Sequence, residues 1–410
     1  MNGTRNESEA GGWNDHGPLR FRVEARCEAN HARLGRVETP HGGFSTPAFM
    51  PVATAAAMKG VLPGQVSELG AEIILNNAYH LMLRPGIDRL RSFGGTHQFM
   101  RWDGPVLTDS GGYQAFSMSD INAIDDDGVT FRSFVDGSKV HMGPESSMEV
   151  QNAIGADIIM AFDDCPPSPH ARHGKGSPRA KLPAPADWQA RLDEAHDRTI
   201  RWLERCVKAH ARPAEQALFG IVQGGTDLDR RDASVDAICG FDLPGFAIGG
   251  VAVGEGADLI RTVVEHTAPR LPEDRPRYLM GVGYERDIVM AVAAGIDMFD
   301  CVLPTRNGRM ASVFTRNGPL RLRHARFRDD QAPIDDQCDC PACAGGFSRA
   351  YLRHCFQADE MVGPILCSLH NLRHFQSLLL DIRTAIRDNA WSSLAGRWPV
   401  LQAGADAPVD

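Results

Sequence analysis

Eight short apolar segments recur along the chain, and they constrain its fold more than any other feature of the sequence. Each ends in polar residues or glycines, and most are followed by a longer stretch with helical periodicity. Near-continuous apolar runs are typical of parallel strands that are buried on both faces. Eight alternating strand and helix units therefore predict an α/β fold, a TIM (β/α)8 barrel rather than an open doubly wound sheet. The segments read FSTPAFMPVAT, AEIILNNAYH, GPVLTDSGGYQ, ADIIMAFDDC, ALFGIVQGG, GFAIGGVAVG, RYLMGVGY and GIDMFDCVLPT.

Polar side chains and glycines gather at the carboxyl ends of these segments. In a barrel of this kind, functional residues lie at that end of the strands. The sequence therefore predicts a site at the barrel mouth. A helix N-cap is the alternative for an aspartate that follows a strand. The residues at these ends are Asn77, Asp109, Asp163, Gln223, Gly249, Gly250, Met280 and Asp300.

A compact cysteine motif near the C-terminus, CDCPAC, places Cys338, Cys340 and Cys343 in a C-x-C-x2-C arrangement. Three thiolates at this spacing predict a tetrahedral zinc site, and four protein ligands would make the ion structural. An iron–sulfur cluster is less suited because a fourth nearby cysteine is not obvious. Spacing alone does not choose the fourth ligand. The candidates are His354, Cys355, Cys367, His370 and His374.

The predicted domain organisation is one large barrel with additions, for which 410 residues suffice. The N-terminal residues are polar and lack the apolar core of a signal peptide, and no run of eighteen uncharged apolar residues occurs. We therefore expect a cytoplasmic protein without a membrane partner, whose ten cysteines are reduced thiols or metal ligands. The predicted parts are a disordered lead-in (1–19), a barrel with an N-terminal β hairpin (20–337), a zinc-binding subdomain (338–370), the last barrel helix (371–397) and a tail (398–410).

The basic residues are distributed unevenly, although the formal net charge is -9. Residues 301–328 hold seven arginines and no acid. Such a block is either a solvated face or a surface that contacts phosphates. The arginines are Arg306, Arg309, Arg316, Arg321, Arg323, Arg326 and Arg328.

Seven motifs, in this order, resemble those of the bacterial tRNA-guanine transglycosylases, which are also called queuine tRNA-ribosyltransferases. They are LTDSGGYQAFS, IMAFDDC, GIVQGG, AIGGVAVGE, RYLMGVG, GIDMFDCVLPTRNGR and the cysteine motif, and the resemblance spans residues 21–397. It implies a TIM barrel with an inserted zinc subdomain and no redox or nucleotide cofactor. The implied enzyme is a homodimer that exchanges the wobble guanine of tRNAs with GUN anticodons for 7-aminomethyl-7-deazaguanine (preQ1), in queuosine biosynthesis.

The resemblance assigns the chemistry to two aspartates. Breaking and remaking a C1′–N9 bond passes through an oxocarbenium-like transition state, which a carboxylate can capture as a covalent ester. By resemblance, Asp300 is this nucleophile and Asp109 handles the protons of the leaving and incoming bases. His370, in an "LHN" context, is by resemblance the fourth ligand of one structural zinc ion per subunit.

The resemblance also assigns the base pocket. Asp163 would accept from the donor edge of guanine, while Gln223 and the backbone N–H of Gly250 would donate to O6. Tyr113 and Met280 would hold the base between them. The further pocket residues are Ser110, Cys165, Val251, Val253 and Glu255.

Base specificity follows from residues of the same motifs. Val253 stands where enzymes that use queuine have glycine, and Cys165 resembles the bacterial form, so we expect preQ1 rather than queuine. The Val251 carbonyl and Glu255 would meet the cationic aminomethyl group. The sequence departs from the usual bacterial pattern at Val251, where leucine is usual, and at Asp164, where glutamate is usual.

The expected partner is the anticodon loop of tRNA, whose target base must leave the stack to reach the pocket. By resemblance, Arg306 and Arg309 contact the uridines that flank the target. Residues 166–187, with Arg172, Lys175 and further cations, are either a tRNA contact or an inert insertion. Two alternatives remain open: a catalytically silent tRNA-binding relative, and an archaeal-type transglycosylase that acts at another tRNA position.

Overall fold

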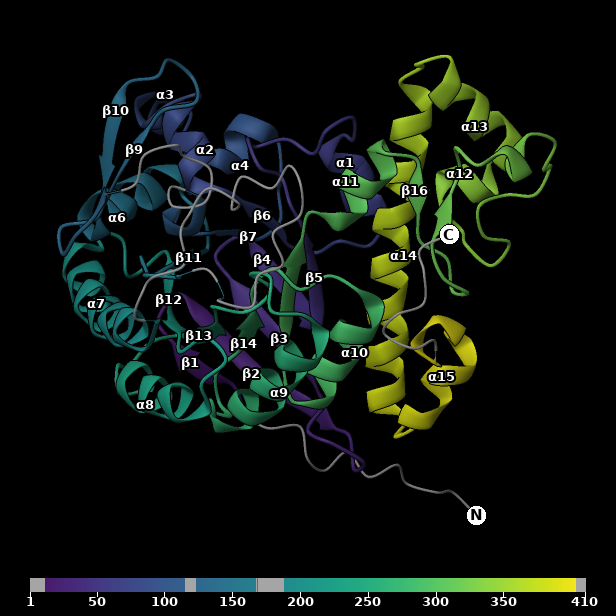
Figure 1. Ribbon diagram of the computed structural model, residues 1–410. Helices are drawn as coiled ribbons and strands as arrows, with labels where there is room; N and C mark the ends of the chain where they lie inside the picture. Colours follow the sequence, from purple (N-terminus) through teal and green to yellow (C-terminus); the bar gives the residue numbers. More distant parts are fainter. Residues whose placement is uncertain (1–11, 115–122, 167, 169–187, 403–410) are drawn as a thin grey trace.

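Eight parallel strands form the centre of the computed structural model, which describes residues 12–114, 123–166, 168 and 188–402 (Figure 1). Each strand pairs with the next one along the barrel, and the last pairs with the first. A parallel bridge between Val52 and Leu75 completes the ring. The predicted (β/α)8 barrel is confirmed. The strands are β5 (Ala48–Pro51), β6 (Ile74–Asn76), β7 (Val106–Thr108), β11 (Ile158–Met160), β12 (Ala217–Val222), β13 (Gly245–Ile248), β14 (Arg277–Leu279) and β15 (Met298–Cys301).

Helices surround this barrel, and the strands divide their side chains between two cores. Successive strand residues point to opposite faces, so Ile158 and Met160 fill the interior while Ile159 meets the helices. The surrounding helices include α1 (Pro63–Glu68), α2 (Ala78–Leu83), α3 (Ile87–Ser92), α4 (Thr96–Met100), α6 (Pro144–Ile154), α7 (Trp188–Ala209), α8 (Leu228–Cys239), α9 (Ala257–Thr267) and α10 (Glu285–Ala293).

A four-stranded antiparallel sheet covers the amino-terminal end of the barrel, which we call the floor. Phe21, Val37 and Phe44 of this sheet pack on the barrel interior. The sequence predicted a hairpin here, preceded by a disordered lead-in over residues 1–19. That boundary is wrong for the part the structure describes, because residues 14–16 pair with 19–21. The strands are β1 (Asn14–His16), β2 (Leu19–Arg26), β3 (Arg33–Thr39) and β4 (Gly42–Thr46).

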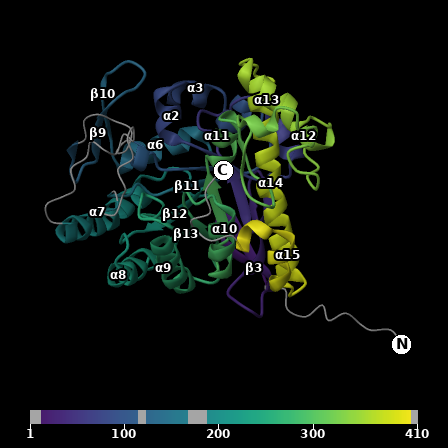
Figure 2. The same ribbon diagram turned by 45° about the vertical axis from the view of Figure 1, so that its right-hand side comes forward.

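A smaller antiparallel sheet, which the sequence analysis did not predict, follows β7 and precedes α6. It consists of β8 (Ala123–Ile124), β9 (Val129–Arg132) and β10 (Lys139–Met142). Figure 2 shows it beyond the barrel helices, on the side opposite to α14.

The C-terminal part forms a lobe joined to the barrel by one long helix, α14 (Val362–Arg387). This helix runs from the lobe along the barrel wall (Figure 1), so the predicted boundary at residue 370 falls inside a continuous helix. Trp398, in the predicted tail, is buried and donates to Asp381 at 2.8 Å. The other elements are α11 (Leu303–Arg309), β16 (Ser312–Val313), β17 (Leu320–Arg321), α12 (Pro341–Ala344), α13 (Arg349–Gln357), α15 (Leu394–Arg397) and four short 3-10 turns, Ala268–Arg270, Ala325–Phe327, Trp391–Ser393 and Pro399–Gln402.

Over the described ranges, none of the helices combines the length and the apolar character needed to cross a membrane.

Candidate active site and metal centre

Asp300 lies near the carboxyl end of β15, at the barrel mouth. Its Oδ1 accepts hydrogen bonds from the Tyr278 hydroxyl at 2.6 Å and from the Gly281 backbone N–H at 2.8 Å. Burial raises the pKa of this carboxyl, and the two hydrogen bonds oppose the rise. Tyr278 is fully buried, and its own pKa is raised well above 10 by burial, so it remains a hydrogen-bond donor.

Asp109 follows β7 and is held by three donors. The Asn77 side chain donates to Oδ2, the Ala78 backbone N–H to Oδ1 at 2.9 Å, and the Gln114 side chain to Oδ2 at 2.8 Å. Burial raises the pKa of Asp109 to about 6, and the negative charge of Asp300 adds to the rise. A carboxyl that titrates near neutral pH can both give and take a proton, as a general acid and base must. The N-cap alternative holds only in part, because one of the three donors is a backbone N–H at the start of α2.

Asp163 follows β11, and it meets residues from two neighbouring strand ends. Gln223 donates to its Oδ2 at 2.6 Å, and the Ser110 hydroxyl lies 3.4 Å from its Oδ1. Burial raises the pKa of Asp163 to about 7, and the charge of Asp164 adds to the rise. The predicted Asp163, Gln223 and Ser110 are therefore brought together.

Gly249 and Gly250 pack directly against the Gln223 amide. A Cβ at Gly250 would lie 2.3 Å from Gln223 Oε1, and one at Gly249 would lie 2.7 Å from Nε2. Gly250 also has a φ of +65°, which disfavours a side chain. Cys165 lies near the Gly250 backbone, and burial raises the pKa of its thiol. Cys165 is therefore neutral beside the predicted O6 donor.

Glu255 forms hydrogen bonds with the backbone of its own loop, which follows Gly250. Its two carboxylate oxygens accept from the backbone N–H groups of Ala252 at 2.5 Å and Val253 at 2.9 Å. Val251, Val253 and Glu255 are buried. Glu255 was predicted as a source of charge for the base. In this structure its hydrogen bonds hold the loop.

Tyr113 and Met280, predicted to hold the base between them, are both half-buried. Met280 directly follows β14, where it packs against the barrel interior, and Tyr113 lies two residues after the Gly111 turn. They belong to the same end of the barrel as the three carboxylates.

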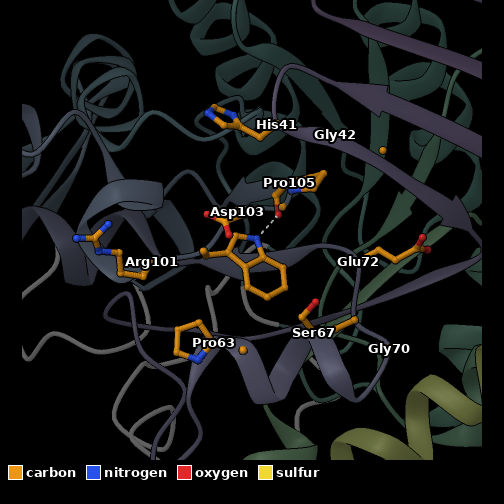
Figure 3. Close-up of a pocket in the computed structure, with 14 residues that line it drawn as sticks. His41, Gly42, Pro63, Ser67, Gly70, Glu72, Arg101, Asp103 and Pro105 are labelled. Carbon is orange, nitrogen blue, oxygen red and sulfur yellow. Dashed lines mark hydrogen bonds between the residues drawn. The ribbon is translucent and has the colours of Figure 1, made fainter.

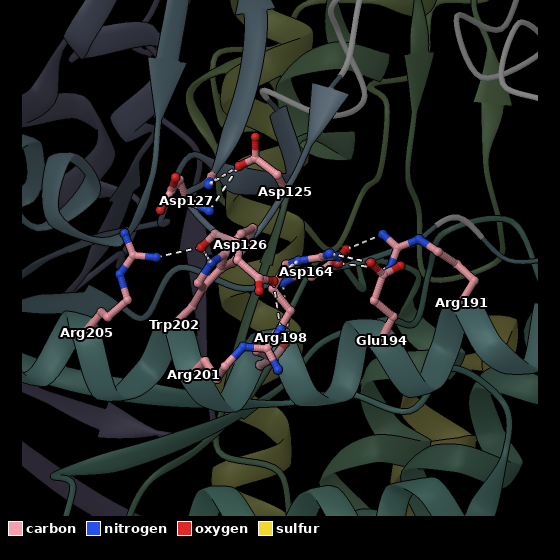
Figure 4. Close-up of polar contacts among 12 residues, drawn as sticks. Asp125, Asp126, Asp127, Asp164, Arg191, Glu194, Arg198, Arg201, Trp202 and Arg205 are labelled. Atoms are coloured by element: carbon pink, nitrogen blue, oxygen red, sulfur yellow. Dashed lines mark hydrogen bonds and ion pairs between the residues drawn. The ribbon is translucent and has the colours of Figure 1, made fainter.

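Asp164 stands where the bacterial pattern usually has glutamate, and the sequence did not show what it does. The structure gives it a clear structural role. Arg191 approaches it with two hydrogen bonds, at 2.9 and 2.5 Å, and Arg198 with one at 2.7 Å. Both arginines come from α7, and Arg198 also reaches Asp126 in the loop between β8 and β9 (Figure 4). Asp164 thus ties α7 to the strand end that carries Asp163.

The metal centre assembles from the cysteine motif and α14. Cys338, Cys340, Cys343 and His370 place their ligand atoms within 4.8 Å of one another. His370 Nδ1 lies 3.4 Å from the sulfurs of both Cys340 and Cys343. The other ring nitrogen of His370 bonds the Phe314 carbonyl at 2.7 Å, which leaves Nδ1 free to bind a metal. This donor set fits a tetrahedral ion.

The competing ligand candidates have other surroundings. His374 bonds Glu285 at 2.8 Å instead. Cys355 and Cys367 are buried thiols that do not join the Cys3His group. Of the five candidates for the fourth ligand, His370 is the one that joins the three cysteines in a group that could hold an ion.

The arginines of the basic block have three kinds of surroundings. Arg306 is exposed and Arg309 half-buried, one turn apart on α11, which directly follows the strand of Asp300. Arg316 is instead engaged by Asp381 at 3.6 Å and by the Trp398 ring. The remaining members are exposed, namely Arg321, Arg323, Arg326 and Arg328.

A cavity of about 320 Å³ is lined by residues that include His41, Glu72, Arg101 and Pro105 (Figure 3). Glu72 and Pro105 precede β6 and β7, so the cavity lies at the floor, opposite to the strand ends that carry the carboxylates. Beside it, His41 and His97 stack on each other and share the carboxylate of Asp157. These three residues form a second possible ligand group. However, Asp157 already accepts from the backbone N–H groups of His41 and Val106, so it has a structural role without an ion.

The insertion at residues 166–187 lies almost wholly outside the described residues, as do its cations Arg172, Lys175, Arg179 and Lys181. Its predicted contact with RNA therefore stays a prediction.

The sequence analysis missed three functional neighbours: Tyr278, Gln114 and Arg231. Tyr278 carried a usable signal, since it precedes Met280 by two residues and so points into the barrel, where its hydroxyl needs a partner. Nothing in the sequence near Gln114 and Arg231 predicted the contacts that these two residues make.

Taken together, the fold and the site define a barrel enzyme with buried carboxylates at its mouth and a cysteine–histidine metal centre in an appended lobe. Residues 27–399 match a family model described as "Queuine tRNA-ribosyltransferase". The chain belongs to this family, and it is a pentosyltransferase.

Relatives that carry the family name cover nearly the whole chain. The protein of Thermus thermophilus is 49% identical over 391 residues, which are 95% of this chain and 96% of that relative. The protein of Symbiobacterium thermophilum is 50% identical over 368 residues, 90% of this chain and 88% of that relative. The protein of Bacillus licheniformis is 47% identical over 372 residues, which are 91% of this chain and 93% of that relative.

Proposed function

We propose that this enzyme exchanges the wobble guanine of tRNAs with GUN anticodons for preQ1, through a covalent ribosyl ester on Asp300. The observation that carries the proposal is the pair Asp300 and Asp109. One buried carboxyl, Asp109, and one half-buried carboxyl, Asp300, lie at one barrel mouth, each with its own hydrogen-bond donors. Such a pair suits a nucleophile and a proton carrier.

The first half of the reaction breaks the bond from C1′ to N9 of guanine. Asp300 Oδ2, which receives no hydrogen bond from the described residues, attacks C1′, while Oδ1 stays bound to Tyr278 and Gly281. The electron pair of the broken bond goes to N9, which takes the proton of Asp109. The products are neutral guanine and the ester.

The second half reverses these steps with preQ1. Asp109, now ionised, removes the N9 proton of preQ1, and N9 attacks C1′. The ester bond to Asp300 breaks, and its electron pair returns to the carboxylate. A pKa of Asp109 near 6 serves both directions, because neither form is strongly favoured near neutral pH.

Base recognition would use the cluster around Asp163. The ionised carboxylate accepts from N1–H and the exocyclic amine, and Gln223 and the Gly250 N–H donate to O6. In the structure, Gln223 bonds Asp163. The bound base would replace this contact, while Tyr113 and Met280 cover its two faces.

The preference for preQ1 over queuine rests on the packed wall around Val253. This side chain is buried, and Glu255 holds its backbone, which supports the proposal that the pocket excludes a bulky cyclopentenediol. The Val251 carbonyl can accept from the aminomethyl group. Competition of preQ1 against queuine tests this step, and efficient use of queuine would contradict it.

The tRNA would bind across α11, where Arg306 and Arg309 read the bases beside the target. The exposed arginines of the basic block would contact phosphates of the same loop. We further propose a zinc ion in the Cys3His centre, with a purely structural role, and a cytoplasmic homodimer in which one subunit catalyses while the other helps to hold the tRNA.

Exchange of labelled guanine into total tRNA, followed by mapping of the modified position, tests the function. We expect label at the wobble position, and Asp300→Asn should abolish both exchange and the trapped covalent RNA adduct. Label at another position would favour the archaeal-type activity. Absence of exchange with retained tRNA binding would favour a silent relative, which the presence of both aspartates argues against.

A further inference from the structure

Arg231 lies on α8 with no exposed surface, directly behind the base-recognition cluster. Its guanidinium donates to three backbone carbonyls at the ends of two neighbouring strands. Nη1 reaches the Val222 carbonyl at 3.0 Å and the Gly249 carbonyl at 2.8 Å. Nε and Nη2 reach the Gly225 carbonyl at 2.9 and 2.8 Å. The side chain therefore joins the loop after β12 to the loop after β13.

The charge of Arg231 is unusual because it lacks an ion-pair partner among the residues that the structure describes. Burial lowers its pKa to about 10, although the negative charge of Glu255 opposes the fall, so Arg231 is still cationic at neutral pH. A buried charge that lacks a direct ion pair is costly. Hydrogen bonds from a charged donor are also stronger than neutral ones, so the three carbonyls are held firmly.

The Gly249 carbonyl belongs to the same peptide group as the Gly250 N–H. A trans peptide is planar, and its C=O and N–H point in opposite directions. Because Arg231 binds the carbonyl at 2.8 Å from one side, the Gly250 N–H points away from Arg231, to the opposite side of the peptide. A cation on the carbonyl also polarises the peptide, which makes its N–H a better donor.

Gln223 is fixed by the same contacts. Arg231 binds the carbonyl of the residue before it, and the Gln223 backbone N–H donates to Ser234 on α8 at 2.9 Å. The Gln223 amide packs against Gly249 and Gly250, whose positions Arg231 also sets.

We propose that Arg231 is a positioning residue for purine recognition, which orients and polarises the Gly250 N–H and fixes Gln223 so that both donate to O6. This role rests on the proposed function. It predicts that removing the hydrogen bonds of Arg231 weakens recognition of O6 selectively, leaving recognition of the donor edge by Asp163 unchanged.

The experiment compares guanine with 6-thioguanine, which keeps N1–H and the exocyclic amine but replaces O6 with sulfur, a weaker acceptor. Affinities are measured by calorimetry without tRNA, in the full-length wild-type protein and in Arg231→Lys and Arg231→Met. Lysine keeps the charge but lacks the planar fork that binds three carbonyls.

Arg277 offers a matched control. It is also buried, it also donates to three backbone carbonyls (those of Leu271, Pro272 and Gly295), and burial also lowers its pKa to about 10. It begins β14, so it lies at the floor rather than the mouth. Arg277→Lys thus reports the general cost of disturbing such an arginine.

We expect Arg231→Lys to reduce the affinity ratio of guanine to 6-thioguanine by about tenfold, equivalent to roughly 1.4 kcal/mol, and Arg231→Met to reduce it at least as much. Arg277→Lys should leave the ratio unchanged. An unchanged ratio in Arg231→Lys, an equal change in Arg277→Lys, or failure of Arg231→Lys to fold would each overturn the proposal. Failure of the proposed function would be seen separately, as absence of guanine exchange by the wild-type enzyme.

Discussion

The Tyr278 hydroxyl donates a 2.6 Å hydrogen bond to Oδ1 of Asp300 from inside the barrel. Tyr278 lies on β14, the neighbour of the strand that carries Asp300. Since its ring is fully buried, the hydroxyl has one fixed position. It therefore holds one carboxylate oxygen and leaves the other for chemistry.

Removing this hydroxyl should slow the chemical step. We expect Tyr278→Phe to lower kcat about 10- to 100-fold, because a hydrogen bond to a charged group contributes about 1.5–3 kcal/mol. The KM values for tRNA and base should stay the same, since Asp300 does not bind the base edge. Steady-state exchange kinetics test this, with the exposed Tyr351→Phe as control. A wild-type kcat in Tyr278→Phe would show that Asp300 is oriented by other contacts.

The affinity for guanine should depend on pH through Asp163. This carboxyl, with a pKa of about 7 in the free enzyme, must be ionised to accept from the base. Affinity should therefore fall about tenfold per pH unit below pH 7 and level off above it. Calorimetry from pH 5.5 to 8 measures this. Asp163→Asn should bind weakly at every pH, and a pH-independent wild-type affinity would argue against Asp163 as the titrating group.

The raised pKa of Asp163 also predicts that the stability of the protein changes with pH, in the direction opposite to that of guanine affinity. The folded state favours the protonated carboxyl, so this group's contribution to the free energy of unfolding falls as pH rises toward 7. Asp163→Asn, which removes the charge, should raise the thermal midpoint at pH 8 more than at pH 4.5. Equal shifts at both pH values would contradict the assignment.

Metal content should depend on His370 and not on its helical neighbour. His370→Ala should lose most of its bound zinc, because three thiolates leave the tetrahedral site open. His374→Ala should keep one equivalent per chain, since that ring bonds Glu285 instead. Elemental analysis decides between them. Loss of zinc in His374→Ala but not in His370→Ala would show that His374 is the fourth ligand.

Gly308 should be required for the position of α11, the helix proposed to contact RNA. A Cβ there would lie 2.7 Å from the backbone nitrogen of Ser368, so Gly308→Ala must push α11 away from α14. We expect a destabilisation of about 1–3 kcal/mol and a higher KM for tRNA, because α11 carries Arg306 and Arg309. Gly396→Ala is the control, since its Cβ would meet nothing within 4 Å. Wild-type KM and thermal midpoint in Gly308→Ala would refute the argument.

Arg306 and Arg309 should matter for RNA and not for the free base. Replacing either with alanine should raise the KM for tRNA, and if the arginine binds a phosphate, its removal should also lower the salt dependence of binding. The affinity for guanine should not change. Arg26→Ala, an exposed arginine at the floor, serves as control. Equal tRNA binding by all three variants would show that Arg306 and Arg309 do not contact the tRNA.

Local patterns were enough to predict the barrel and its order of strands. Each strand segment carries its own signal, because a strand buried on both faces needs a continuous apolar run. The same reasoning placed Asp109, Asp163 and Asp300 at one end. The lead-in was predicted wrongly, because residues 14–16 are polar and form a strand only by pairing with β2.

Contacts between distant segments could not be predicted in this way. The sequence offered five candidates for the fourth metal ligand, and only the approach of α14 to the cysteine motif placed His370 among the thiols. Asp164 was an unexplained departure until α7 supplied Arg191 and Arg198.

The sequence by itself determined the elements, their order and the chemical groups available at the strand ends, since these depend on periodicity and residue type within a few turns. Only the tertiary structure decided which groups meet. The partners of Tyr278 and Arg231 come from other strands and loops, and burial sets the pKa values of the carboxyls at the mouth. Both depend on distance and on exclusion of water, which arise only when the barrel closes.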